Sequence, residues 1–406
     1  MRIRTWCVGV ALLSFSVPTA GQTPLSEADA LARLSAESPR VRAIRAAVEL
    51  TRADALASGR WPNPRATFNR ESVAGVTENM VTVTQALPIT GRRGLEMSAA
   101  SALVSASSSR ADEEIRRARA ELRAAYADLV SAQTREAELA GWRDRLRAFA
   151  DVLARREAAG DAAGYDRLRT EREAMDIEGE WSAARVDRIR AQGALAAFFA
   201  DAGDASGIVA APPAPTSAPI PPVEELVVRA GMVRGEPAAL RQEVEAARFA
   251  ERAAARRLVP EPELVAGTKS SSMGGGDVGS VVSVHASVAL FDRAQPERAM
   301  ARARLAQAEA RAEMFRVVLQ AQVAAWRAVV IERRDAAGRY RVTATESADR
   351  LERIAQVSYD AGERGILELL DAYRSGSSSR TRQAALDAAV RQAEIELEFV
   401  SGWEIQ

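Results

Sequence analysis

Few side chains in this chain could carry out covalent or metal chemistry, and they are isolated from one another. Cys7 is the only cysteine and His285 is the only histidine. A cysteine nucleophile, a zinc-thiolate site or a Ser-His-Asp triad would need one of them. Cys7 lies in an apolar N-terminal stretch, and His285 lies in an alternating pattern where a polar wall residue is the simpler interpretation. The sequence therefore predicts no enzyme, no metal site and no cofactor.

The most suggestive charged pair is Glu368 with Asp371, three residues apart and thus on one face of a helix. On their own, two such carboxylates are ordinary solvated charges at a helix end. Repeated around a symmetry axis, they would form two acidic rings that favour cations over anions. Whether these two carboxylates form such rings therefore depends on the helices and strands that position them.

Composition favours long helices and gives no electrostatic reason to expect a nucleic-acid partner. The 406 residues include 55 Lys and Arg and 55 Asp and Glu, so the formal net charge is zero. Alanine, arginine and glutamate dominate, while aromatic residues are sparse. Residues 1–21 have the basic start, short apolar run and small-residue end of a cleavable signal peptide. Cys7 is not at the cleavage point, so lipidation is not expected.

Prolines divide the chain into regions that can and cannot hold long helices. None occurs between Pro88 and Pro212, and none follows Pro296. Both regions keep apolar residues at helical spacing, as at Leu146, Phe149 and Leu153. A helix over 95–157 would be about 95 Å long, at 1.5 Å per residue. That length exceeds the width of an ordinary globular domain.

The two halves of the chain follow one plan. Pro62 and Pro64 recur as Pro260 and Pro262, each 198 residues later (260 − 62, 262 − 64). We interpret this as a duplicated domain. The first repeat, 22–211, holds a helix, a strand pair near 65–88 and a long helical hairpin over 92–200. The second repeat, 223–406, holds a helix, a strand pair near 263–291 and a helical hairpin over 295–403. The Ala- and Pro-rich segment 203–222 links them.

Each strand pair alternates apolar and polar residues, as membrane-spanning strands do. Val282 and Val284 fall on one face, and Ser283 and His285 on the other. Polar hairpin tips are expected at 72–79 and 270–277. Four strands cannot close a membrane barrel, and open edges are not tolerated in lipid. If the strands span a membrane, the barrel must be shared between chains.

At this point the sequence resembles the TolC-like outer-membrane efflux family, over nearly the whole of its length. The resemblance rests on the duplicated plan and on three motifs. The first motif, VTQALPITGRR at 83–93, is a strand-to-helix junction like that of the heavy-metal branch of the family. The second and third motifs are helix-hairpin tips, EAAGDAAGYD at 157–166 and YDAGERGILELLDA at 359–372. The third motif is the most specific. The first tip departs from the pattern, because Gly164-Tyr165 stands where a small or hydroxylated residue is more usual.

The resemblance implies a mainly α protein with a small β part. Three chains would share a twelve-stranded transmembrane barrel that continues into a periplasmic tube of antiparallel helices. The chain would then be a passive conduit for metal cations or small molecules. It would reside in the outer membrane and work with a periplasmic adaptor protein and an inner-membrane pump of the resistance-nodulation-division (RND) type.

The same resemblance assigns roles at the tips. Gly160 and Gly362 would be the hairpin turns. Asp166 would pair with Arg364 and accept a hydrogen bond from Tyr359, and these links would hold the entrance shut. Glu368 and Asp371 would form the acidic rings at the narrowest point.

Two other classes of protein would show part of this sequence pattern. A periplasmic adaptor would have a signal peptide and a helical hairpin, but one hairpin rather than a whole-chain duplication. A soluble coiled-coil scaffold would not need the matched strand pairs.

Overall fold

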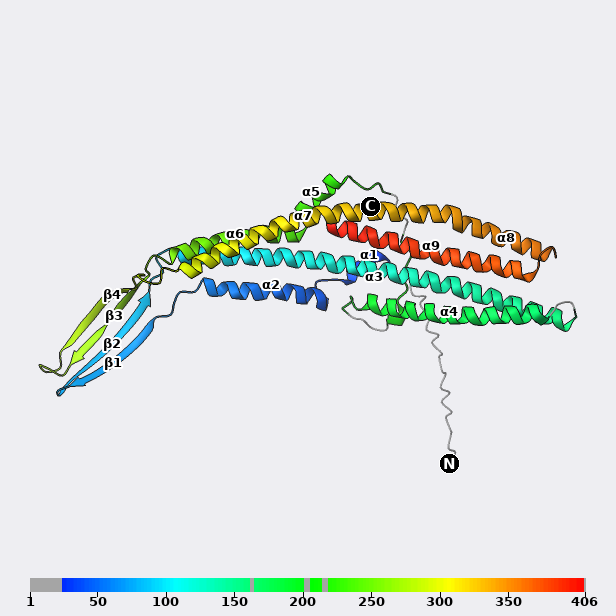
Figure 1. Cartoon of the computed structure of the whole chain (residues 1–406). Helices are drawn as coiled ribbons and strands as arrows, with labels where there is room; N and C mark the ends of the chain where they lie inside the picture. Colours follow the sequence, from blue (N-terminus) through cyan, green and yellow to red (C-terminus); the bar gives the residue numbers. More distant parts are fainter. Residues whose placement is uncertain (1–23, 161–163, 201–204, 214–217, 405–406) are drawn as a thin grey trace, which may run out of the picture.

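The computed structural model describes residues 24–160, 164–200, 205–213 and 218–404. Long helices lie side by side and form an elongated body, and a β-sheet extends from one end (Figure 1). This arrangement confirms the predicted fold class, long helices with four strands. The predicted signal peptide, 1–21, lies outside the described residues.

The helices and strands follow the same order in both halves of the chain. The first half contains α1 (Glu27–Arg33), α2 (Pro39–Ser58), β1 (Arg65–Val73), β2 (Val76–Ala86), α3 (Arg92–Ala158), α4 (Gly164–Ala196) and the short 3-10 turn η1 (Ala205–Gly207). The second half contains α5 (Val223–Val233), α6 (Gly235–Arg256), β3 (Pro262–Ser271), β4 (Val278–Ala286), α7 (Gln295–Tyr340), the π-helical segment η2 (Arg341–Thr345), α8 (Glu346–Asp360) and α9 (Ile366–Ser401).

Helix α3 is the central element of the body. Its 67 residues give it a length of roughly 100 Å. It starts after Gly91, whose φ of 74° places it in the left-handed region that glycine tolerates. It packs against α2 and α6 towards the sheet, and against α4 and α9 towards the other end.

The matching helix of the second half is interrupted. A π-helical segment, η2, separates α7 from α8. Within and beside it, Thr343 Oγ1 donates to the carbonyl of Arg339 and Ser347 Oγ donates to that of Thr343. Hydroxyl groups that bond back to the preceding turn bend helices, which explains why a proline-free stretch still loses regular α geometry here.

The four strands form one antiparallel sheet in the order β1-β2-β3-β4. The first hairpin turns at Ala74 and Gly75, which have φ of 51° and 83°. Two consecutive positive φ values are those of a tight type I′ turn. The predicted long tip at 72–79 is therefore wrong, because strand pairing continues to Val73 and Val76. Strand β4 ends at Ala286, earlier than the alternating pattern suggested.

A buried tyrosine hydroxyl and a buried ion pair attach other segments of the body to α3. Tyr126 of α3 is buried, and its hydroxyl lies 2.8 Å from the carbonyl oxygen of Leu25 and 2.6 Å from that of Ala211. Glu113 of α3 accepts hydrogen bonds from Arg234 Nε at 2.7 Å and from the backbone N–H of Gly235 at 3.0 Å. These contacts fasten the N-terminal segment and the start of α6 to the central helix.

Candidate functional site

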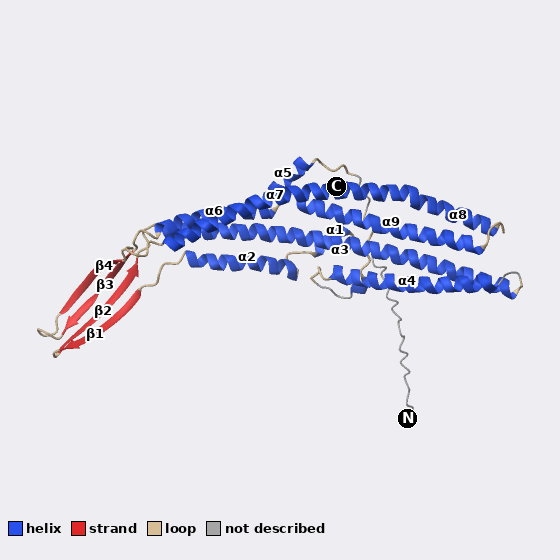
Figure 2. Cartoon of the chain, viewed as in Figure 1, coloured by secondary structure: helices blue, strands red, loops and turns tan. Residues whose placement is uncertain are grey.

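One face of the sheet is apolar and exposed. The strand register places apolar residues in adjacent rows across all four strands, so that their side chains share a face: Ala66, Phe68, Val81, Val83, Leu264, Ala266, Val282 and Val284. In the described part of the chain no helix covers this face (Figure 2). Gln85, Thr268 and Ser280 also lie on this face, so it is mainly apolar. A mainly apolar face open to the surroundings marks an interaction surface for lipid or for another protein.

The opposite face of the sheet is more polar, although Met80, Val265 and Val281 also lie on it. It carries Thr82, Thr84 and Ser283 in neighbouring rows. Lys269 Nζ lies 2.6 Å from Glu78 Oε2 across strands β2 and β3. His285 also lies on this face, with Nε2 3.3 Å from Ser283 Oγ, as a polar wall residue would. A sheet with one apolar and one polar face suits a barrel wall between lipid and water.

Both edges of the sheet are unpaired within the chain. Strands β1 and β4 each pair on one side only within the chain. An unpaired strand edge leaves N–H and C=O groups without partners, at a cost of several kcal/mol for each group in hydrocarbon. A single chain therefore cannot place this sheet in a membrane, whereas several chains pairing β4 with β1 could.

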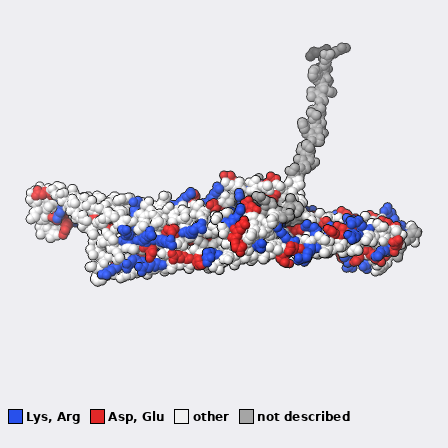
Figure 3. Space-filling view, turned by 90° about the horizontal axis from the view of Figure 1, so that it is seen from above, with Lys and Arg blue, Asp and Glu red and all other residues white. Residues whose placement is uncertain are grey.

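Charge is distributed unevenly over the molecule. Lys, Arg, Asp and Glu crowd the helical body, and the sheet shows few of them (Figure 3). By length and composition alone, one described helical stretch, Gln295–Asp360, is long and apolar enough to cross a membrane. Leu319, Val323 and Val330 of this stretch are buried against α5 and α9, whereas only 17% of its most apolar window is buried.

Both helical hairpins turn at the end of the body farthest from the sheet (Figure 1). Gly160 and Gly362 have φ of 81° and 74°. The N–H of Gly362 donates to the carbonyl of Tyr359 at 3.0 Å, and that of Glu363 to Ser358 at 2.9 Å. This pair of bonds is the Schellman ending of a helix, in which glycine takes the left-handed position.

The two carboxylates singled out in the sequence lie in the first turns of α9. Glu368 and Asp371 are both exposed, while Leu369 and Leu370 on the other side of the helix are buried. The buried leucines pack against Trp142 and Ile177 in a cluster that joins the hairpins. This packing orients the two carboxylates away from the protein core.

The predicted links among Asp166, Arg364 and Tyr359 do not form within one chain. No ion pair joins Asp166 to Arg364 among the described residues. The hydroxyl of Tyr359 lies 3.5 Å from Arg156 Nη1 instead. Across the first tip, Arg167 Nε lies 2.5 Å from Glu157 Oε2. A link between Asp166 and Arg364 would have to join neighbouring chains.

Sequence reasoning missed an ion-pair hub just behind the tips. Arg380 of α9 contacts Glu138 of α3 at 2.7 Å, and Asp349 and Glu352 of α8 at 2.9 Å each. Burial lowers the pKa of Arg380, but the carboxylates of Glu138 and Glu352 outweigh burial and hold the pKa above its ordinary value. The hub ties the α8–α9 hairpin to the central helix, and no local sequence signal pairs residues so far apart.

A hollow of about 760 Å³ lies between α3, α4 and α9 near the hub. Hydroxyl and charged side chains from α4 and α9 surround it, including Glu173, Ser377 and Thr381. Trp142 forms part of its wall, and its buried indole Nε1 has no hydrogen-bond acceptor among the described residues. Arg374 and Glu173 bridge two of the helices, with Nε 2.8 Å from Oε1.

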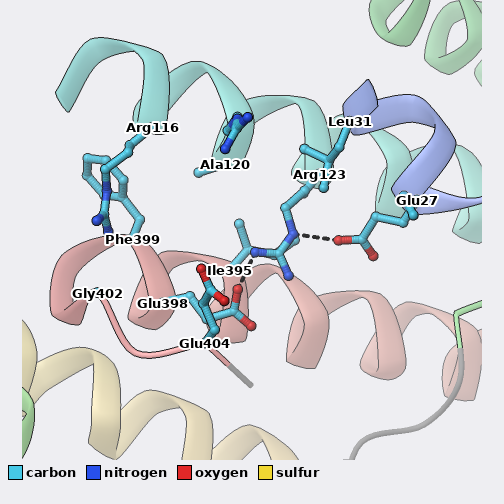
Figure 4. Close-up of a pocket in the computed structure, with 12 residues that line it drawn as sticks. Glu27, Leu31, Arg116, Ala120, Arg123, Ile395, Glu398, Phe399, Gly402 and Glu404 are labelled. Carbon is cyan, nitrogen blue, oxygen red and sulfur yellow. Dashed lines mark hydrogen bonds and ion pairs between the residues drawn. The ribbon is translucent and has the colours of Figure 1, made fainter. Parts of the chain in front are cut away.

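A second hollow, of about 670 Å³, lies near the middle of the body between α1, α3 and the end of α9 (Figure 4). Arg123 extends between Glu27 and Glu398 and contacts both. Arg391 contacts Glu27 as well, at 2.9 Å. Glu27, Arg123 and Glu398 in this hollow are thus paired, and the described residues contain no group of acidic, His or Cys side chains arranged for a metal ion.

No protein-family model and no curated protein matches the sequence. Solved structures do share its fold. A membrane protein from Pseudomonas aeruginosa has a TM-score of 0.77 and 20% identity, covering 93% of each chain. The outer membrane protein VceC from Vibrio cholerae has a TM-score of 0.75 and 16% identity, covering 94% of this chain and 97% of that one. The outer membrane channel CmeC from Campylobacter jejuni has a TM-score of 0.76 and 11% identity, covering 99% and 94%.

Proposed function

We propose that this chain, which has the fold of TolC-like outer-membrane channels, is one of three identical protomers of such a channel. The observation that carries the proposal is the two-faced, open-edged sheet at the end of a helical body roughly 100 Å long. Three copies would supply twelve strands and close the barrel without a free edge. The polar face would then line the pore, and the apolar face would meet lipid.

The helices would form a tube that continues the barrel through the periplasm, closed at the hairpin tips. The channel would act passively, as the outer part of an efflux system that exports metal cations or small molecules. Its partners would be an RND-type inner-membrane pump and a periplasmic adaptor, whose helices could dock near the hollow beside Trp142. Residues 1–21 would direct secretion of the protein and would then be removed by cleavage.

The structural likeness favours this function over the two rivals. A periplasmic adaptor with one hairpin does not account for two hairpins and two strand pairs in one chain. A soluble coiled-coil scaffold has no use for the exposed apolar sheet face, which would promote aggregation in water.

Electron microscopy of the mature protein in a mild detergent tests the proposal. We expect a threefold tube well over 100 Å long, with the sheet end inside the detergent belt. A monomer or an elongated dimer that stays soluble without detergent would contradict it and favour the adaptor or the scaffold.

A further inference from the structure

The long helices of the two repeats, α3 and α7, have different surroundings. Helix α3 packs against α2 and α4 of its own repeat and also against α6 and α9 of the other repeat. Helix α7 packs against α5, α6 and α9 of its own repeat, and no comparable packing joins it to α2 or α4 in the described part of the chain. Helices α7 and α8 lie at one edge of the body, and α2 and α4 lie at the opposite edge (Figure 1). Helix α7 thus lacks the partners from the other repeat that α3 has.

Matched features show which residues are equivalent in the two repeats. Gly91 and Ala294 each precede a long helix in the left-handed conformation, so α3 and α7 match at a spacing of 203 residues (294 − 91). Pro39 and Pro237 each lie in the first turn of a helix, so α2 and α6 match at a spacing of 198 (237 − 39). Each contact between α3 and α6 within the chain therefore predicts a contact between α7 and the α2 helix of a second copy.

Apolar residues at equivalent positions differ in exposure. Ala111 of α3 is 8% exposed, whereas its equivalent on α7, Met314, is 62% exposed. Ala254 of α6 is 7% exposed, whereas its equivalent on α2, Leu56, is 72% exposed. Large apolar side chains are therefore exposed on α7 and α2 at positions that are buried on α3 and α6. Exposed apolar side chains of this kind are typical of a surface that another protein chain covers.

Charges at equivalent positions have exchanged signs. Within the chain, Arg110 of α3 contacts Glu243 of α6 and lies 3.6 Å from Glu236. The equivalent of Arg110 on α7 is Glu313, and the equivalent of Glu243 on α2 is Arg45. The long helix thus supplies the arginine within the chain, and it supplies the glutamate at the exposed edge. Both arrangements bring opposite charges together.

The same charges are repeated one helical turn away on α2 and α7. Arg42 precedes Arg45 by three residues, and Glu309 precedes Glu313 by four, so each pair shares a helix face. Both arginines are exposed and join no ion pair among the described residues. The side chains of Glu309 and Glu313 are 51% and 64% exposed. Even a shift of one turn between the helices keeps an arginine opposite a glutamate.

The exchange of signs recurs nearer the hairpin tips. Glu138 of α3 contacts Arg380 of α9 at 2.7 Å. At the spacing of 203, the equivalent of Glu138 is Arg341, the first residue of η2. Helices α4 and α9 match at a spacing of 202, from the glycines of the two tips, and the equivalent of Arg380 on α4 is Glu178. Arg341 and Glu178 are again opposite charges in reversed order, and their side chains are 52% and 41% exposed.

We infer that α2 and α4 of one copy bind the exposed side of α7 and α8 in a second copy, and that the exchanged charges make this contact selective. Arg42 and Arg45 would lie opposite Glu309 and Glu313. If α2 of another copy replaced α6 beside α3, its arginines would meet Arg110, and like charges that meet at an interface oppose association. Each edge of the chain therefore accepts the opposite repeat of another copy and rejects the wrong one. The inference rests on the proposed channel of three copies.

The first test reverses the charges. One variant carries Arg42→Glu and Arg45→Glu, a second carries Glu309→Arg and Glu313→Arg, and a third carries all four changes. Dissociation of the trimer by urea in a mild detergent is followed by light scattering, at low and at high salt. We expect each double variant to dissociate at a lower urea concentration than the unaltered protein, and the quadruple variant to recover most of the loss. The loss should shrink at high salt, because ions screen exposed charges.

The control variant reverses charges on the far sides of the same two helices. Asp54 and Arg304 lie nine residues from Arg45 and Glu313 (54 − 45, 313 − 304), which is about two and a half helical turns. Asp54→Arg with Arg304→Glu should dissociate like the unaltered protein. If the unaltered protein is a monomer, the channel proposal fails together with this inference. If it is a trimer that both double variants leave equally stable, or that the quadruple variant does not restore, only this inference is wrong.

The second test detects the contact without reversing any charge. Arg45→Cys and Glu313→Cys are combined in a Cys7→Ser background, which removes the only native cysteine. A short bis-maleimide reagent should link these cysteines between chains, because α2 and α7 do not pack together within one chain, and a denaturing gel should show dimers and trimers. The control pair Asp54→Cys, Arg304→Cys should give monomers. Linkage of the control pair at least as strong as that of residues 45 and 313 would overturn the inference.

Discussion

The carboxylate of Glu352 in α8 lies against Gly376 of α9, so closely that a Cβ added at residue 376 would overlap it. Glu352 is held in this position by Arg380, whose Nη2 lies 2.9 Å from Oε1, and by Arg145 of α3 at 3.7 Å. The missing side chain at residue 376 therefore makes room for a carboxylate that connects three helices behind the tips.

Gly376→Ala should displace Glu352 and take one partner from Arg380. We expect a loss of about 1–3 kcal/mol in the free energy of unfolding, the usual cost of overpacking. Urea unfolding in detergent, followed by circular dichroism, measures it. Gly338→Ala is the matched control, because a Cβ at that helical glycine meets nothing within 4 Å. It should be neutral or stabilising, and equal losses in the two variants would show that the Glu352 contact has no special role.

Glu27 should make stability depend on pH in the acid range. Burial raises the pKa of this carboxyl, but Arg391 and Arg123 outweigh burial and hold the pKa below its ordinary value of 4.5. A lowered folded-state pKa gives stability that is complete above pH 4.5 and is lost as the pH falls through the folded-state value.

We therefore expect Glu27→Gln to cost about 2 kcal/mol at pH 7, as for other hydrogen bonds to charged groups, and far less at pH 3. Thermal midpoints measured between these two pH values test this. Glu37→Gln, at an exposed position on the loop between α1 and α2, should change neither midpoint. A constant difference between the Glu27 variant and the unaltered protein at all pH values would contradict the ion-pair explanation.

Arg364→Ala and Asp166→Ala should each make the closed channel leaky. The predicted links of these residues do not form within one chain, so they would act between neighbouring protomers in the trimer. Conductance in a planar bilayer should rise for both variants and stay unchanged for Arg304→Ala, which lies on α7 away from the tips. Conductance like that of the unaltered protein in both tip variants would refute the links.

The double variant Glu368→Ala, Asp371→Ala should lower the preference for cations. Both carboxylates are exposed on one face of α9 near the hairpin tip, where three copies would form two acidic rings. The reversal potential in a salt gradient should move towards zero. Glu332→Ala, at an exposed site on α7, should leave it unchanged. If the reversal potential of the double variant stays the same, these residues do not line the narrowest point.

The sequence by itself determined the kind of elements and where the helical hairpins turn. Period-two alternation at Val282 and Val284 reports the backbone of a strand and the face its side chains occupy. The absence of proline permits a helix such as α3, and glycines at 160 and 362 mark where the hairpins turn. These signals are local, because backbone geometry repeats every two or 3.6 residues. The fold class followed from them, aided by the resemblance of the tip motifs to a known family.

Only the tertiary structure decided which distant residues meet. Nothing near Gly376 indicates that it must face Glu352, and nothing near Arg380 indicates three carboxylate partners on two other helices. The rotation and spacing of whole helices select such contacts, and many sequences satisfy the same helical pattern. Likewise, the pairing of β2 with β3 joins the two repeats into one apolar face. That face depends on register, which is set by long-range packing and not by either strand alone.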